Sequence, residues 1–149
     1  MARELDSTLH ARIVLLSEAG DKQAAEGAYQ DALIKYSEAW KMLPEPKLDW
    51  EAATWIQSAI GDAWFLSGNY SEALKAFSSA VQSPDGLGNP FIHLRLGECH
   101  FELGDKMRAA DELTRAYMGA GREIFANESP KYLELLKRAL DPPSGKIKL

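Results

Sequence analysis

The sequence lacks the features that mark several common classes of protein. It has a single cysteine, Cys99, which excludes an intrachain disulfide framework and favours a reducing compartment. No stretch approaches the roughly 18 consecutive apolar residues of a membrane span, and the first residues have neither the apolar core nor the cleavage site of a signal peptide. We therefore expect a cytoplasmic protein that does not bind membranes, although secretion by a signal-free route stays open.

The sequence is also short of basic charge and of catalytic motifs. Its formal net charge of −5 argues against nucleic acid as a partner, because phosphates require a basic surface. The glycines of the stretch 86–88 are not followed by the lysine of a phosphate-binding loop. No pair of carboxylates stands out from the ordinary charged surface of helices. We expect no enzymatic activity, no catalytic residue and no cofactor.

What the sequence does contain is a repeated frame of small residues. Glycines seven residues apart occur three times, as do alanines seven apart, and each leading glycine precedes its alanine by 12 residues. The glycine pairs are Gly20 and Gly27, Gly61 and Gly68, and Gly97 and Gly104; the alanine pairs are Ala32 and Ala39, Ala73 and Ala80, and Ala109 and Ala116. Such a frame indicates an internal repeat.

Each repeated segment has the pattern of two helices. In the middle segment Asp49 can cap a first helix from about Trp50 to Leu66, and Gly68 suits the left-handed residue that follows a helix. A second helix is expected from about Tyr70 to Gln82. Alternating apolar and polar residues, the mark of strands, are not sustained anywhere. The sequence therefore predicts an all-α fold.

The repeat resembles the tetratricopeptide repeat, whose pattern is W-x2-L-G-x2-Y, then A-x3-F, then P. The middle segment matches it at Ile60, Gly61, Trp64, Ala73, Phe77 and Pro84, while Gln57 departs from it at the tryptophan place. The resemblance implies a right-handed superhelix of three helix pairs, at about residues 6–44, 49–84 and 90–121. A C-terminal capping helix is expected at about 129–141, beginning at Ser129-Pro130. We expect one domain over residues 1–141 and a flexible tail over 142–149.

The adjacent Cys99 and His100, with His93 before them, raise the alternative of a nucleophile–base pair or a metal site. Neighbouring residues on a helix point about 100° apart, so Cys99 and His100 would not face each other. Two histidines are too few for a closed metal site. The resemblance places both histidines in aromatic packing positions, so we expect packing roles and no metal. A catalytic protein would instead lose its activity on Cys99→Ser or His100→Ala.

The middle unit holds surplus residues at 46–53, which we expect to lengthen its first helix at the start. That extension would carry Trp50 and Trp55 beyond the usual end of the groove. The two tryptophans could then form a contact between two copies of the chain, so a homodimer stays open.

The resemblance also implies that one stripe of each first helix lines a concave groove where a partner binds. The candidate partner-binding residues on this stripe are Ser17, Asp21, Trp55, Asp62, Phe65, Phe91, Leu94, Glu98, Phe101 and Glu102. An acid recurs at the same place in each unit, as Asp21, Asp62 and Glu98. Aromatic residues are common anchors of binding surfaces. The alternative is that Trp55 and Phe91 only cover neighbouring helices or the extended loop.

A groove that is acidic and aromatic suits a partner with a basic or mixed basic and apolar surface. Co-chaperones of the family hold the C-terminal carboxylate of a peptide with basic residues and asparagines on this face. Here three acids would repel such a carboxylate.

The stretches 96–104, 115–125 and 129–136 resemble small stand-alone bacterial repeat proteins that are often associated with polymorphic toxin loci. We expect a non-enzymatic protein-binding module, most specifically an immunity protein that neutralises a cognate toxin. The alternative is a scaffold, adaptor or chaperone-like protein that holds a peptide segment.

Overall fold

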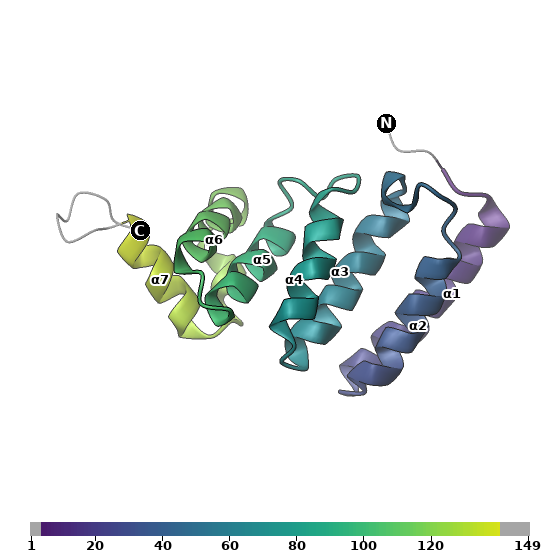
Figure 1. The fold of residues 1–149 in the computed structure, drawn as a ribbon, viewed down its shortest axis with the longest axis horizontal. Helices are drawn as coiled ribbons and strands as arrows, with labels where there is room; N and C mark the ends of the chain where they lie inside the picture. Colours follow the sequence, from purple (N-terminus) through teal and green to yellow (C-terminus); the bar gives the residue numbers. More distant parts are fainter. Residues whose placement is uncertain (1–3, 141–149) are drawn as a thin grey trace. The chain divides into compact units, whose positions relative to one another are not determined.

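The computed structural model describes residues 4–140, and every regular element within that range is a helix (Figure 1). The expected all-α fold is thereby confirmed. The expected tail at 142–149 lies outside the described residues. The chain divides into two compact units between Leu87 and Gly88, which we call the N-terminal and C-terminal units. One domain over residues 1–141 stays a prediction.

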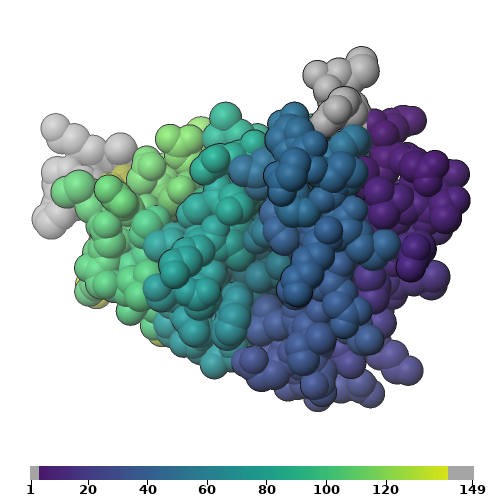
Figure 2. Space-filling view, turned by 45° about the vertical axis from the view of Figure 1, so that its right-hand side comes forward, coloured from purple at the N-terminus to yellow at the C-terminus, as the bar shows by residue number. Residues whose placement is uncertain are grey.

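The N-terminal unit consists of two helix pairs. Its elements are α1 (Ser7–Ala25), α2 (Tyr29–Lys41), the short 3-10 helix η1 (Lys47–Asp49), α3 (Glu51–Leu66) and α4 (Tyr70–Val81). The side-chain oxygen of Asn69 accepts the backbone N–H of Glu72 at 3.2 Å and so caps α4. Gly68 has a φ of 88°, as expected for the residue that ends the helix before it. In the space-filling view α2, in blue, lies between α1 in purple and the second pair in teal (Figure 2).

The first glycine of each repeat permits a close approach between the two helices of a pair. A Cβ at Gly61 would lie 2.7 Å from Cε2 of the Phe77 ring, which is too close for any real contact. The same holds for Gly20 against Tyr36 at 2.6 Å and for Gly97 against a Leu113 methyl group at 2.7 Å. The neighbour of Gly61 is therefore the large residue of the A-x3-F pattern. This contact explains why the frame keeps glycine inside a helix, where it costs about 1 kcal/mol relative to alanine.

The surplus residues of the middle unit lengthen its first helix only in part. Residues 47–49 form η1, whereas residues 51–53 are the first turn of α3, which begins at Glu51. The Trp50 ring is buried, and its Nε1–H donates to the carbonyl oxygen of Pro44 at 2.8 Å. Trp50 belongs to the same core cluster as Ile13 and Ile56. The expectation that Trp50 offers a contact to a second copy is therefore wrong, because the chain folds back and buries the ring.

The C-terminal unit contains the third helix pair and the capping helix. Its elements are α5 (Pro90–Glu102), α6 (Lys106–Ala120), the 3-10 helix η2 (Arg122–Phe125) and α7 (Pro130–Leu140). Asn89 caps α5 through its side-chain oxygen, and Pro90 occupies the first turn. Phe125 of η2 and Leu136 of α7 pack with Leu113 of α6 in one core cluster. The expected capping helix is thus present and begins at Pro130.

Candidate functional site

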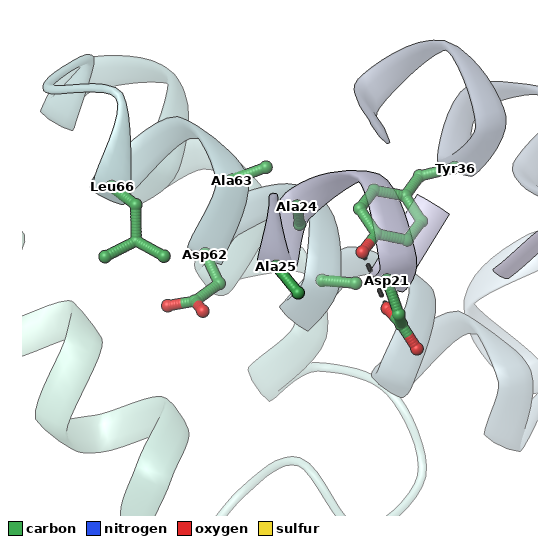
Figure 3. Close-up of a pocket in the computed structure, with 8 residues that line it drawn as sticks. Asp21, Ala24, Ala25, Tyr36, Asp62, Ala63 and Leu66 are labelled. Carbon is green, nitrogen blue, oxygen red and sulfur yellow. Dashed lines mark hydrogen bonds between the residues drawn. The ribbon is translucent and has the colours of Figure 1, made fainter. Parts of the chain in front are cut away.

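The N-terminal unit has a pocket between α1 and α3, which we call the α1–α3 pocket (Figure 3). Its volume is about 290 Å³. Four alanines, one leucine, one tyrosine and two aspartates line it: Asp21, Ala24, Ala25, Tyr36, Ala59, Asp62, Ala63 and Leu66. Two of the three acids that recur in the repeat frame therefore lie in the same pocket.

The pocket exists because α1 carries small side chains where another first helix carries large ones. Ala24 and Ala25 occupy the frame positions that Phe101 and Glu102 occupy in α5, four and five residues after the leading glycine. An alanine fills little of the space between two helices. In the view of Figure 3, Ala25 lies between the carboxylates of Asp21 and Asp62. The site thus combines an apolar floor with acidic flanks.

A hydrogen bond from α2 holds the Asp21 carboxylate in place. The hydroxyl of Tyr36 donates to Oδ1 of Asp21 at 2.6 Å (Figure 3). Burial, this hydrogen bond and the nearby carboxylates of Asp21 and Asp62 all raise the pKa of Tyr36, so the hydroxyl stays protonated. Sequence reasoning did not assign Tyr36 to the site. One feature of the sequence could have indicated its role: Tyr36 carries a hydroxyl at a position where the second repeat has phenylalanine and the third has leucine.

A second, larger concavity, which we call the α2–α3 groove, lies on the N-terminal unit. Its volume is about 590 Å³, and sequence reasoning did not predict it. Its apolar lining includes Ile34 and Trp40 of α2 and Trp64 of α3, with Glu38 and Lys41 as its charged residues. Because it carries one charge of each sign, the groove gives no electrostatic indication of a ligand.

The predicted groove aromatics differ in how far they are exposed. Trp55 is 37% exposed and Phe91 is 38% exposed, so both present part of a ring to solvent. Phe65 is half-buried, with its ring edge-on to Tyr70 at a centroid distance of 5.4 Å. The Arg95 guanidinium carbon lies 5.1 Å from the centroid of the Phe91 ring. Whether these rings bind a partner stays a prediction.

Three of the predicted partner-binding residues are buried and do not have the exposure expected of a groove. Ser17 is buried in α1, and its hydroxyl donates to the carbonyl oxygen of Ile13 at 2.9 Å. Leu94 is 1% exposed and packs in the core of the C-terminal unit. Glu98 is completely buried. Helical spacing shows which residues share one stripe of a first helix, but it does not show what packs against that stripe.

In the C-terminal unit the chain itself covers Phe101 and Glu102. The Tyr132 ring of α7 packs edge-on against Phe101 at a centroid distance of 5.3 Å. The Tyr132 hydroxyl donates to Oε2 of Glu102 at 2.7 Å, and the Lys131 ammonium lies 2.6 Å from the same oxygen. Burial alone would raise the pKa of Glu102, but the hydrogen bonds from Lys131 and Tyr132 and the lysine charge outweigh it and lower that pKa. These two predicted site residues therefore hold the capping helix.

The buried Glu98 shares an arginine with a second carboxylate. Nη1 of Arg95 lies 2.7 Å from Oε1 of Glu98 and 2.6 Å from Oε1 of Glu128, the residue shortly before α7. Burial raises the pKa of Glu98 to about 8, helped by a hydrogen bond with Glu128 and by its charge, while Arg95 acts in the opposite direction. Glu98 is thus protonated over most of the neutral range, and it connects α5 to the segment before the cap.

His93 and Cys99 of α5 are both buried. Nδ1 of His93 lies 2.7 Å from Oε1 of Glu112, and Nε2 accepts the backbone N–H of Gly88 at 3.0 Å, so Nδ1 carries the proton. The Cys99 thiol is buried. Within residues 4–140, no group of three or more histidine, cysteine or acidic side chains is placed to hold a metal ion.

No helix in the described part of the chain has the length and apolarity needed to cross a membrane.

Comparison with known proteins agrees with this helical arrangement. The model of the Tetratricopeptide repeat family matches residues 59–123, from α3 to η2. No curated protein matches the sequence significantly. Together with the helix pairs, the match supports the resemblance found in the sequence.

Solved structures with the same fold cover most of the chain. The type III secretion chaperone SycD of Yersinia enterocolitica, in complex with a peptide of the translocator YopD, is 18% identical with a TM-score of 0.66, over 89% of this chain and 92% of that one. The first TPR of Spaghetti (RPAP3), bound to an HSP90 peptide, is 19% identical with a TM-score of 0.68, over 89% and 96%. PcrH of Pseudomonas aeruginosa is 23% identical with a TM-score of 0.63, over 92% and 90%. These likenesses show the tetratricopeptide-type fold of helical hairpins.

Proposed function

We propose that the protein is a non-enzymatic adaptor or chaperone-like module that binds a segment of a partner protein on the α1–α3 face of its N-terminal unit, in the cytoplasm. The observation that carries the proposal is the α1–α3 pocket, which is open, largely apolar and flanked by two aspartates. The fold supports it, since two of the three similar structures named above were solved with a peptide bound.

The proposed binding surface extends beyond the pocket along α3. Trp55 lies one helical turn before Ala59, which lines the pocket, and spacings of three and four then lead to Asp62 and Leu66. Tryptophan is enriched among the residues that contribute most to the binding energy of interfaces. The partner segment would therefore lie along α3 and contact both the ring and the pocket.

The charge of this surface selects among partner segments. Asp21 and Asp62 would repel a C-terminal carboxylate, so the co-chaperone mode of binding such an end is disfavoured. A basic or basic-apolar segment is complementary to the pocket.

The toxin-immunity hypothesis has less support than the adaptor hypothesis. None of the three similar structures named above is described as a toxin inhibitor. The two hypotheses differ in the partner that each needs. A folded toxin would bury well over about 1,200 Å², the lower range for stable complexes, whereas an adaptor binds an isolated peptide. Selection of binders from a displayed library of random 15-residue peptides tests the adaptor hypothesis directly, and failure to select any peptide would contradict it.

We expect Trp55→Ala to weaken binding of the selected peptides about tenfold or more, as truncation of a hot-spot aromatic does. Helicity and melting temperature should change little, because the ring is partly exposed. Fluorescence anisotropy of labelled peptides and circular dichroism measure the two effects. The matched control is Ile34→Ala, which truncates an exposed apolar residue of the α2–α3 groove. A lower melting temperature with unchanged affinity would instead assign Trp55 to packing.

A further inference from the structure

Residues 82–89 join α4 to α5, and the boundary between the two units falls within this connection, after Leu87. Leu87 is 75% exposed. Gly88, the first residue of the C-terminal unit, has a φ of 88°, and its backbone N–H donates to Nε2 of His93 in the first turn of α5 at 3.0 Å. A histidine side chain therefore fixes the connection at the point where it enters the C-terminal unit.

We propose that this hydrogen bond makes the connection sensitive to pH: when His93 gains a second proton in mildly acidic solution, Gly88 is released and residues 87–89 become more mobile. The chemical reason is that neutral imidazole has one N–H and one bare nitrogen, whereas imidazolium has two N–H groups and no acceptor. Histidine is the side chain whose charge ordinarily changes between about pH 5 and 8. The proposal does not depend on what the N-terminal unit binds.

The contacts of the His93 ring decide which nitrogen takes the second proton. Nδ1 donates to Oε1 of Glu112 at 2.7 Å, which leaves Nε2 as the acceptor for Gly88. His93 is 3% exposed, so water has little access to either nitrogen. A second proton goes to Nε2, and two N–H groups then face each other across the same 3.0 Å. Gly88 must therefore move away from a charged ring.

The carboxylate of Glu112, on α6, supplies the counter-charge for a buried imidazolium. Protonation would turn the contact at Nδ1 into a charge-assisted hydrogen bond, which is stronger than a neutral one. Nε of Arg115 lies 3.9 Å from the same carboxylate oxygen, but this arginine is exposed, so water screens its attraction to Glu112. The ring can thus exchange its bond to Gly88 for an ion pair with Glu112.

The other charged groups around α5 are engaged or lie in neighbouring segments. Arg95 and Glu98 of α5 form ion pairs with each other and with Glu128. The charged residues of the connection and of η2, which packs against α5, are Asp85, Arg122 and Glu123. Glu112 is therefore the acid whose contact with the ring gives the proton a reason to bind.

Comparison of the three repeats shows that the fold does not require this pair. His93 lies four residues before the leading glycine of its repeat, and Glu112 lies three residues after the leading alanine. The equivalent pairs in the first and second repeats are Leu16 with Lys35 and Gln57 with Ala76. A histidine and a facing acid occur together in the repeat that follows the boundary between the units and in neither of the others.

The test is an NMR titration of the full chain between pH 8 and pH 5. The ¹⁵N signals of the ring should show that Nε2 of His93 gains a proton while Nδ1 keeps its own. The amide signal of Gly88 should shift with the same midpoint. Its protection against hydrogen exchange, corrected for the intrinsic rate at each pH, should fall about tenfold, as expected for the loss of one hydrogen bond. If His93 stays neutral down to pH 5, or if Gly88 keeps its protection beside a charged ring, the proposal fails.

Glu112→Gln is the informative variant. Glutamine keeps an oxygen that accepts from Nδ1 but removes the counter-charge, so the midpoint at Gly88 should move to lower pH by about one unit or more. The matched control is His100→Gln, which removes a half-buried histidine two turns further along α5 and should leave the midpoint where it is. A midpoint that follows His100, or that does not respond to Glu112→Gln, would overturn the proposal.

Discussion

Replacing Gly61 with leucine is expected to destabilise the N-terminal unit by about 1–3 kcal/mol, the usual cost of overpacking a core. Even the Cβ of the new side chain would lie 2.7 Å from the Phe77 ring. That ring is completely buried, so it has little room to move away. Urea denaturation followed by circular dichroism measures the free energy of unfolding. The better helix propensity of leucine works in the opposite direction but is smaller, at about 1 kcal/mol.

A second variant separates overpacking from other effects of the substitution. Phe77→Ala alone should cost about 3–5 kcal/mol through the cavity that it leaves. If the leucine clashes with the ring, then Gly61→Leu with Phe77→Ala should cost less than the sum of the two single variants, because the leucine side chain can fill part of the cavity. Strict additivity, or a stable Gly61→Leu protein, would contradict the packing argument for the repeated glycine.

The second large effect is a dependence of stability on pH that comes from Glu98. Its pKa is about 8 in the folded chain, against an ordinary value of 4.5 for a glutamate side chain. The folded state therefore binds more protons than the unfolded state between these values, and the free energy of unfolding should decrease as pH rises through this range. One such group contributes at most about 1.4 kcal/mol per pH unit. Its stabilising contribution is present in full below about pH 4.5 and is lost above about pH 8.

Glu98→Gln tests this dependence against the background of all other groups. The amide stays neutral, and its oxygen can accept from Arg95 as Oε1 of Glu98 does. Relative to the parent, the variant should gain stability steadily from pH 5 to pH 8 and should be the more stable protein at pH 9. Denaturation curves of both proteins at each pH measure the difference. A constant difference across this range would show that Glu98 does not titrate as described.

Local signals were sufficient to predict most of the helices, because they depend on residues close together in the chain. The capping side chain of Asn69, the glycine after α3 and Pro90 in the first turn of α5 all act within one helical turn. The burial of Trp50, which the sequence did not indicate, has a long-range cause. Its ring belongs to one core cluster with Ile13 of α1 and donates to the Pro44 carbonyl oxygen, and no local pattern contains these contacts.

The candidate site could be predicted only in part. The repeat frame places Asp21 and Asp62 at equivalent positions of neighbouring first helices, and the structure brings both to one pocket. The frame does not contain the role of Tyr36, because its hydrogen bond joins residues 15 apart on two helices. Nor does it contain the α2–α3 groove, which depends on how side chains of two different pairs meet.

By itself the sequence determined the all-helical class, the pairing of helices and the position of an acid on each first helix, since spacing along a helix decides which residues share a face. Tertiary structure decided which of those acids remain accessible. Asp21 is exposed beside an open pocket, whereas Glu98, at the same frame position, is completely buried. The physical reason is that burial depends on what packs against a face. The segment leading to α7 brings Glu128 to the Arg95–Glu98 pair, and α7 covers Phe101 and Glu102.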